Sequence, residues 1–283
     1  MEFFIDIFEY QYLANAFFAA IFAGITCGIV GTYIMARRMV FLCGGITHAS
    51  FGGLGIALYA GINPTMGAML FAVLSAIGIE FSSEKGGLRE DSAIGIIWSI
   101  GMAVGALFMS LTPGYTSGDL ASYMFGSIIT VTTQDVITLG IFTLMCVVGA
   151  LIWWRQIMYI AFDRDFAASQ GIATRTISYL LIIVVAITIV LAIRIMGIVL
   201  LLSLFTIPAV TANILTKSYA KITLWAAIIA TMGALFGLVI SYNWEIPPGT
   251  CIIFILTIAL IVAKLLSLRS KKNIECELRR YIS

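Results

Sequence analysis

The chain has 283 residues, of which 61% are hydrophobic and only 11% are charged, and its formal net charge is +2. A soluble globular domain is about half apolar and about a quarter charged, so this composition indicates an integral membrane protein. The small net charge does not suggest nucleic acid as a partner, and the length fits one membrane domain without an additional soluble enzyme domain.

The N-terminus and the cysteines do not indicate a secreted, disulfide-bonded protein. The N-terminal segment before Leu13 is acidic and has no basic residue, whereas a secretory signal starts with a positive region. The apolar run that follows is too long for a signal's core, so we expect it to remain as a membrane anchor. The cysteines have neither a CxxC pair nor zinc-type spacing, and we expect free thiols at Cys27, Cys43, Cys146, Cys251 and Cys276.

Nine apolar stretches are candidates for transmembrane helices, because a helix needs about 20 apolar residues to cross roughly 30 Å of hydrocarbon. In chain order they are Leu13–Ala36, Met39–Asn63, Pro64–Ile79, Ser92–Thr112, Val136–Trp154, Thr176–Ile193, Ile195–Thr216, Ile222–Tyr242 and Pro248–Ala263. Pro208 interrupts the seventh stretch, and the sixth and seventh could be bent or re-entrant. The sequence therefore predicts an all-α, polytopic membrane protein with about nine spans, eight being the alternative.

The basic residues predict the orientation of these spans, since Lys and Arg gather in cytoplasmic loops. Every basic residue except Arg194 follows an odd-numbered stretch. We therefore expect the N-terminus outside, the C-terminus in the cytoplasm, a membrane domain over residues 1–266 and a charged cytoplasmic tail over residues 267–283.

The longest cytoplasmic loop, residues 155–175, contains a candidate docking helix. Asp163 to Gln170 has the pattern of a short helix that includes Ala167 and Ala168, and Gly171 is a typical C-terminal stop. A short helix of small residues suits contact with another protein. An ordinary solvated loop is the alternative.

The longest outside loop, residues 113–135, contains acidic and aromatic residues and no base. Asp119 and Asp135 could attract a cationic ligand or the carrier that delivers it. The topology alone, which keeps bases out of outer loops, explains the same pattern, so both interpretations stay open.

His48 is the only histidine in the sequence. It lies about nine residues into the second stretch, which places it roughly 14 Å deep, near mid-membrane. Ionisable groups at that depth commonly mark a pathway, and imidazole is a common ligand of transition metals. Thr47 and Cys43 could add oxygen or sulfur ligands. The alternative is a histidine that packs against, and hydrogen-bonds to, a neighbouring helix.

The glycines around His48 allow two interpretations. Gly44, Gly45, Gly52, Gly53 and Gly55 permit close helix packing, and they also permit unwinding where a cavity is lined. The sequence contains no GxSxG, HExxH or GxxxxGK[ST] motif, so we expect no enzymatic activity in this chain.

The chain resembles the metal-ion ABC importer permeases that serve zinc, manganese and iron, from about Leu13 to Leu266. The resemblance lies in the order and spacing of RRMVFLCGGITHASFGG (37–53), EDSAIGIIWSIGMAVGALFMSL (90–111), FDRDFAASQG (162–171), and MGIVLLLSLFTIPAVTANIL (196–215) followed by SYNWEIPPG (241–249). The first is similar to the family's arginine-rich loop and Ser-His-Ala helix. The third is similar to the loop that docks on the ATPase.

The resemblance implies a multi-pass protein of the plasma membrane, surrounded by lipid, that forms a homodimer. It also implies two cytoplasmic ATPase subunits and an external metal-binding protein as partners, with the divalent metal ion as cargo and no resident cofactor. It assigns Asp163, Ala167, Ala168 and Gly171 to ATPase docking and places His48 in the metal path.

One position departs from the family pattern. Family members commonly have an Asp four residues before this histidine, where the present chain has Gly44. We therefore expect a transient site, or His48 side chains from two protomers. The alternatives are a permease for a metal chelate such as haem or a siderophore, and an ion-coupled secondary carrier, which would need carboxylates inside the membrane.

Overall fold

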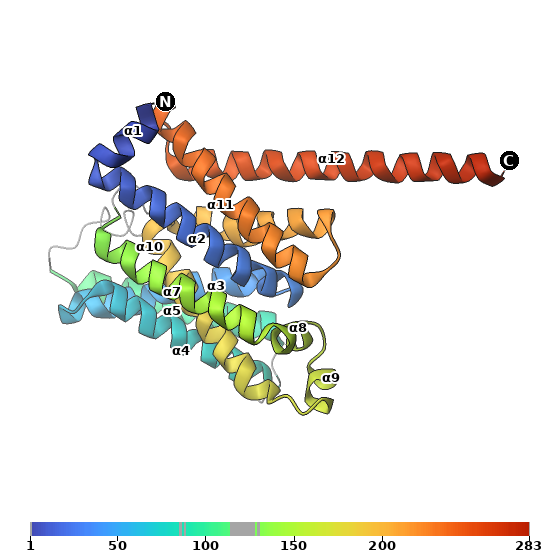
Figure 1. The fold of residues 1–283 in the computed structure, drawn as a ribbon. Coiled ribbons are helices and arrows are strands. Elements are labelled where there is room, and N and C mark those ends of the chain that lie inside the picture. The colour runs from blue at the N-terminus through green and yellow to red at the C-terminus, as the bar shows by residue number, and fades with distance from the viewer. Residues whose placement is uncertain (1, 85–86, 88, 114–127, 129–130, 283) are drawn as a thin grey trace.

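The apolar stretches form long helices in the computed structural model, which describes the backbone of residues 2–84, 87, 89–113, 128 and 131–282 (Figure 1). Within these residues there is no strand. The helices are α1 (Glu2–Glu9), α2 (Gln11–Ala36), α3 (Val40–Ala60), α4 (Pro64–Glu84), α5 (Glu90–Leu111), α7 (Thr133–Ile152), α8 (Trp154–Phe162), α9 (Arg164–Ser169), α10 (Thr174–Leu215), α11 (Tyr219–Trp244) and α12 (Pro248–Ile282).

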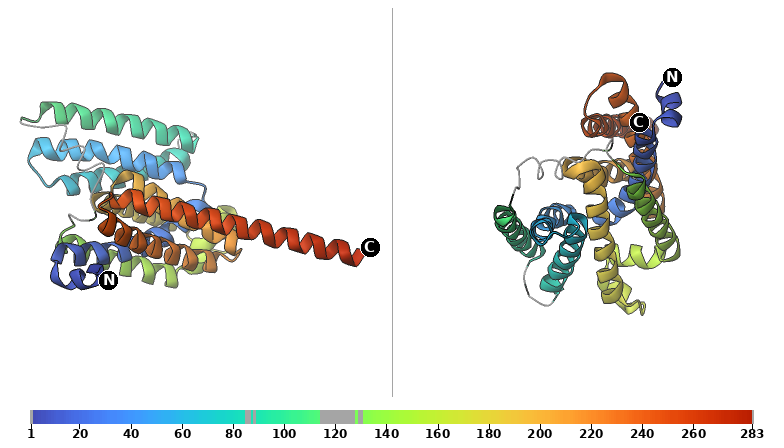
Figure 2. Two further views of the ribbon diagram at one scale, coloured as in Figure 1. Left: turned by 90° about the horizontal axis from the view of Figure 1, so that it is seen from above. Right: turned by 90° about the vertical axis from the view of Figure 1, so that its left-hand side faces the viewer.

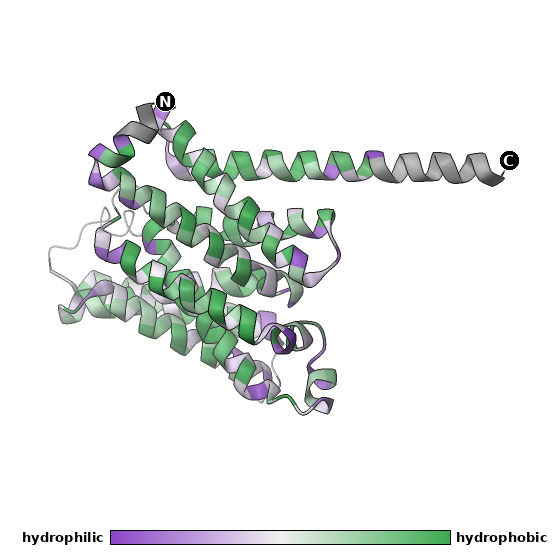
Figure 3. Ribbon diagram, viewed as in Figure 1, coloured by the Kyte–Doolittle hydropathy of each residue, from purple (hydrophilic) through white to green (hydrophobic). Residues whose placement is uncertain are grey.

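In the described part of the chain, 8 helices are long and apolar enough to cross a membrane, which confirms the predicted all-α polytopic class. Figure 3 shows apolar residues along the lengths of these helices and hydrophilic residues gathered near α8 and α9. Large apolar side chains such as Leu70, Leu74 and Leu144 are exposed, as expected where lipid is the solvent. The outside loop of the sequence analysis, with Asp119, lies largely outside the described residues.

Helix α10 lies at the centre of the fold, between two groups of helices (Figure 2). On one side, α3 packs against α5 and α4. On the other side, α2 packs against α11 and α7, and α12 packs against α10 and α11. Both groups contact α10, so this helix connects the part of the molecule that carries His48 with the rest.

Helix α10 bends at Gly197, whose backbone dihedrals are φ 76° and ψ 171°. Only glycine adopts this region readily, so Gly197 permits the bend. Pro208 lies inside the second limb. The sequence predicted two separate spans with a turn at Arg194, and the structure joins them as two limbs with the bend three residues later. Arg175, in the first turn of α10, pairs with the last turn of α4, whereas Arg194 bonds to the first turn of α4.

The second limb of α10 returns to the end of the bundle from which the first limb starts. Asn213, near its end, lines a cavity together with Arg37 at the end of α2 and Arg164 at the start of α9. Within the described residues, the two limbs of α10 and the seven other spanning helices therefore cross the bundle nine times, because α10, one of the 8 spanning helices, crosses it twice. We refer to the end that carries α9, the C-terminus of α2 and the C-terminus of α4 as the α9 end.

Candidate functional site

His48 lies on α3 and packs against Trp98 of α5. The two rings are stacked, with centroids 4.4 Å apart and an interplanar angle of 4°. Phe51, one turn further along α3, lies 6.1 Å from the imidazole. The His48 side chain is half-buried, and its Nδ1 atom is buried without a hydrogen-bond partner among the described residues. The imidazole is therefore held in orientation by aromatic packing and keeps a free ring nitrogen.

The structure does not bring Thr47 and Cys43 onto the side of α3 where His48 lies. Both side chains are fully buried within the protein, whereas His48 is partly exposed. Residues four apart share a helix face, so Cys43 and Thr47 lie on one face while Gly44 and His48 lie on another. Among the residues that the structure describes, no group of three His, Cys, Asp or Glu side chains could hold a metal ion.

The glycines of α3 are explained by close packing, since α3 is an unbroken helix from Val40 to Ala60. A Cβ atom on Gly55 would lie 2.6 Å from the carbonyl oxygen of Gly105 on α5, a separation that real Cβ atoms do not show. The helix backbones therefore approach as closely as small residues allow in a membrane.

Gly44 is different from the other glycines of α3. A Cβ atom at Gly44 would meet only the Trp98 ring, at 3.9 Å, whereas a Cβ atom at Gly45 would collide with the side chain of Ile94. Gly44 therefore leaves open space beside His48, on the same helix face. A side chain could occupy this space without displacing the backbone.

The candidate docking helix forms as predicted, as α9. Asp163 is its N-cap, and its Oδ1 accepts a 2.9 Å hydrogen bond from the backbone N–H of Phe166. Gly171 follows with φ 75°, and its N–H donates to the carbonyl oxygen of Ala168, while the N–H of Ile172 donates to that of Ala167. This is the left-handed C-terminal arrangement that favours glycine.

The residues assigned to docking divide between the two sides of α9. Asp163, Ala168 and Gly171 are exposed, whereas Ala167 is fully buried against the rest of the protein. The outward surface of α9 is therefore formed by Asp163, Ala168 and Gly171, and Ala167 anchors the helix to the bundle.

An ion pair ties α9 to α4. Arg164, the first residue of α9, donates a hydrogen bond to the Glu80 carboxylate, whose side chain is 6% exposed. Glu80 follows directly after the predicted stretch Pro64–Ile79, yet it lies within α4 and is buried. A second pair at the α9 end, Arg175 with Glu84, has an N–O distance of 3.5 Å and is more exposed. Neither Trp98 nor the Glu80–Arg164 pair was identified from sequence.

The chain is similar to known membrane transport proteins over most of its length. A profile of the ABC 3 transport family matches residues 9–267. The chain is 36% identical over 254 residues to a probable metal transport system membrane protein of Chlamydia muridarum, covering 88% of this chain and 86% of that protein. It is 28% identical over 263 residues to the manganese transport system membrane protein MntC of Listeria innocua, covering 93% of each.

Solved structures share the fold. PsaBC from Streptococcus pneumoniae in complex with Fab superimposes with a TM-score of 0.81 at 26% identity, covering 93% of this chain and 94% of that chain. An inward-facing conformation of a putative metal-chelate type ABC transporter gives a TM-score of 0.72 at 15% identity, covering 89% and 85%, and supports the fold alone. With a family profile that covers nearly its whole length, the chain belongs to the ABC 3 transport family, as a multi-pass membrane permease that is not itself an enzyme.

Proposed function

We propose that this protein is the permease subunit of an ABC importer that takes up divalent transition-metal ions, namely Zn²⁺, Mn²⁺ or Fe²⁺. The observation that carries the proposal is the free Nδ1 atom of the half-buried His48, because neutral imidazole is a good ligand for these metals. The names of the Chlamydia and Listeria relatives, which refer to metal and manganese transport, support it.

One imidazole is too sparse to hold an ion, so we propose that two copies of the chain contribute. In a homodimer in which the partly exposed faces around His48 meet, two imidazoles would face one path. A transporter must also release its cargo, which favours few and weak ligands. The metal ion is cargo in this proposal, and Thr47 and Cys43, buried on another face, act as packing residues of α3.

Transport energy comes, in this proposal, from separate cytoplasmic ATPase subunits that bind the outward surface of α9. We propose that the α9 end is cytoplasmic and that the N-terminus lies outside, where a metal-binding protein would deliver the ion, because basic residues gather on the cytoplasmic side. An ion-coupled carrier is less consistent with the structure, because the buried carboxylate of Glu80 is paired with Arg164.

Uptake by proteoliposomes tests the proposal. The permease would be reconstituted with its ATPase and metal-binding protein, and ATP-dependent accumulation of Mn²⁺, Zn²⁺, Fe²⁺, haem and a ferric siderophore would be measured in parallel. We expect accumulation of at least one free divalent ion and of neither chelate. Accumulation of a chelate without any free ion would reject the proposal.

The proposed orientation needs its own test. In a cysteine-free background, single cysteines replace Tyr10 and Arg269, both of which are exposed. A membrane-impermeant thiol reagent added to intact cells should label position 10 only. Labelling of position 269 alone would reverse the topology.

A further inference from the structure

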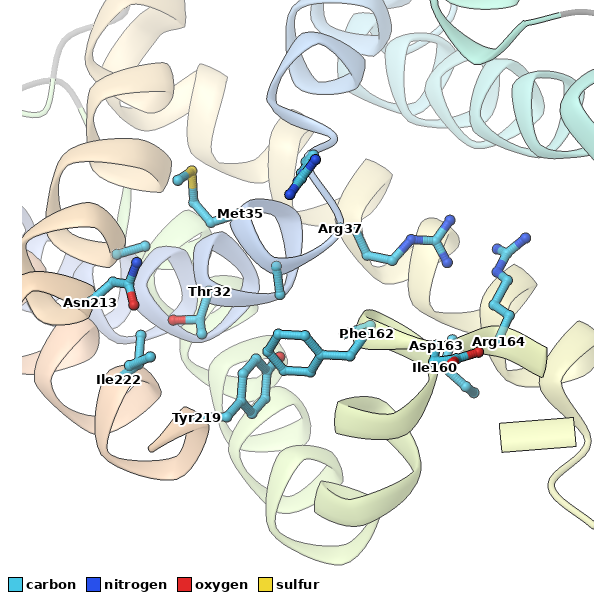
Figure 4. Close-up of a pocket in the computed structure, with 14 residues that line it drawn as sticks. Thr32, Met35, Arg37, Ile160, Phe162, Asp163, Arg164, Asn213, Tyr219 and Ile222 are labelled. Atoms are coloured by element: carbon cyan, nitrogen blue, oxygen red, sulfur yellow. The ribbon is translucent and has the colours of Figure 1, made fainter. Parts of the chain in front are cut away.

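A cavity of about 700 Å³ opens at the α9 end of the molecule, between α2, α8, α10 and α11 (Figure 4). Polar and apolar side chains share its lining, among them Thr32, Asn213, Phe162, Ile160 and Ile222. Of the residues that line the cavity, the transport role proposed above uses only Asp163, on the outward surface of α9.

The charge of this cavity is predominantly positive. Arg37, Arg38 and Arg164 line it, and Asp163 is the acidic residue among the lining side chains. Arg164 is paired with Glu80, but neither Arg37 nor Arg38 forms an ion pair with any described residue. Guanidinium groups without an ion pair attract anions and repel divalent cations, so the cavity is better suited to an anion than to the cargo.

Arg37 has a hydrogen-bond donor at this cavity that is unpaired among the described residues. Its Nη1 atom is buried and has no hydrogen-bond acceptor within the described part of the chain. In Figure 4 its guanidinium points toward the same region as that of Arg164. Guanidinium groups match phosphate oxygens with two parallel hydrogen bonds, which makes a phosphate group a suitable acceptor here.

A second cavity, of about 410 Å³, lies beside the first within the apolar part of the bundle. It is lined almost entirely by apolar residues of α2, α7, α8 and α10, such as Met145, Ala150 and Leu181. Tyr219 lines both cavities, and its ring lies 5.1 Å from Trp154, on the apolar side, and 5.7 Å from Phe162, on the polar side. A charged cavity and an apolar one therefore meet at one side chain.

We propose that these two cavities together bind an anionic phospholipid from the leaflet at the α9 end. Its phosphate is held by Arg37 and Arg38, and one acyl chain lies in the apolar cavity lined by Ala150. Basic pockets between transmembrane helices are suited to anionic headgroups, and the adjoining apolar space favours a lipid over a free phosphate ion. This inference goes beyond the proposed transport and does not depend on which metal is carried.

Thermal unfolding of the purified full-length permease in a non-ionic detergent tests the proposal. The protein would be titrated separately with short-chain phosphatidylglycerol, short-chain phosphatidylcholine and inorganic phosphate. We expect phosphatidylglycerol to raise the unfolding temperature with an affinity about tenfold or more above that of phosphatidylcholine, as two arginine contacts predict. Equal affinity for the two lipids contradicts the proposal, and an equal response to inorganic phosphate reassigns the site to a free anion.

Arg38→Gly is the most informative variant. Arg38 has φ 58°, a conformation that glycine adopts more readily than any L side chain, so the variant should fold at least as well as the parent protein. We expect about fivefold weaker binding of phosphatidylglycerol, and about thirtyfold with Arg37→Gln added. Arg155→Gln, an exposed arginine on α8 that lines neither cavity, should leave binding unchanged.

The apolar half of the site has its own variant and control. Ala150→Phe would fill the cavity and weaken phosphatidylglycerol binding, whereas Leu151→Phe, at a position that is 75% exposed, should not. Native mass spectrometry of the unmodified protein, released from membranes that contain both lipids, gives a test without any substitution. Retained phosphatidylglycerol supports the site, and retention of phosphatidylcholine alone refutes it.

Discussion

The guanidinium of Arg194 lies 3.2 Å from the carboxylate of Asp135, at the end of the bundle opposite α9. Arg194 also donates a 3.1 Å hydrogen bond to Thr65, so the residue next to the α10 bend is tied to the first turns of α7 and α4. Arg194 was the only basic residue that departed from the charge pattern of the sequence. Its two partners explain how a base is accommodated there.

The Asp135 carboxylate has two roles that substitution can separate. It also receives the backbone N–H of Thr132 in a capping box at the start of α7. Arg194→Ala should lower the free energy of unfolding by less than about 1 kcal/mol, because the pair is partly exposed. Asp135→Ala should lower the free energy of unfolding by about 1 kcal/mol more than Arg194→Ala does, because it removes the helix cap as well. Equal losses in denaturant unfolding would contradict the two-role assignment.

Gly197→Ala should destabilise the α10 bend. At φ 76° and ψ 171°, any L side chain is strained, so the substitution should lower the free energy of unfolding by about 1–3 kcal/mol. Gly95→Ala on α5 is the matched control, since open space surrounds Gly95 and its backbone is helical. Gly95→Ala should raise the free energy of unfolding by about 0.5–1 kcal/mol, as measured by denaturant unfolding. A neutral Gly197→Ala would mean that the bend does not depend on glycine.

Glu80→Gln should weaken the attachment of α9 to the bundle. The substitution leaves the guanidinium of Arg164 without its carboxylate partner, and we expect the free energy of unfolding to fall by about 1–3 kcal/mol. The effect is limited because Arg164 is 37% exposed and water partly replaces the lost partner. Glu84→Gln removes the more exposed pair at the same end and should cost less than about 1 kcal/mol. ATPase-coupled uptake, measured per folded molecule, should fall in the first variant only. Similar behaviour of both variants would show that the buried pair has no special role.

His48→Ala should abolish most metal uptake without a comparable loss of thermal stability. Because only neutral imidazole ligates, uptake by the parent protein should fall at acid pH, where the imidazole becomes protonated. A packing role for His48 predicts the reverse pattern, with lower stability and normal uptake by the surviving protein. Normal specific uptake by His48→Ala would falsify the metal-path assignment.

Gly44→Asp should tighten metal binding and slow release. The open space at Gly44 accepts the carboxylate, which then lies on the same helix face as His48. Gly45→Asp is its control, because a side chain there collides with Ile94 and should prevent correct folding. Isothermal titration with Mn²⁺ or Zn²⁺ measures the affinity, and unchanged affinity in well-folded Gly44→Asp would place the metal path elsewhere.

Ala168→Arg should block ATPase binding while the permease still folds. Ala168 is exposed on the outward surface of α9, whereas Ala167 is fully buried. Ala167→Arg should therefore reduce folded protein, and its transport defect would not report on docking. Co-purification of the ATPase with each variant separates the effects. Full co-purification with Ala168→Arg would exclude this surface as the contact.

The helices could be predicted from sequence because membrane spans depend on length and apolar composition alone. The turn between the two spans was predicted at the charged residue Arg194, three residues before the bend. The backbone dihedrals of Gly197, which define the bend, cannot be recognised in a single sequence. The short helix that starts near Asp163 and the stop at Gly171 were predicted correctly, because such signals act within a few residues of the helix.

Contacts between distant segments could not be predicted in the same way. Glu80 and Arg164 are separated by 84 residues, and nothing local to either residue indicates the other. His48 was singled out by its rarity, but its stacking on Trp98 depends on how α3 and α5 pack. The buried side of α9 was also undetermined, because a helix of 6 residues is too short for its periodicity to define a face.

The glycine contacts of α3 have a mechanical consequence. Where Gly55 meets Gly105 and Ala49 meets Gly101, the backbones of α3 and α5 touch directly, without a larger side chain between them. We therefore expect α3 and α5, with α4 beside them, to move as one rigid unit. We expect a displacement of α9 to be passed to these helices through the ion pair between Arg164 and Glu80. The bend of α10 at Gly197 lies at the opposite end, so we expect such a displacement to tilt α3, α4 and α5 about that bend.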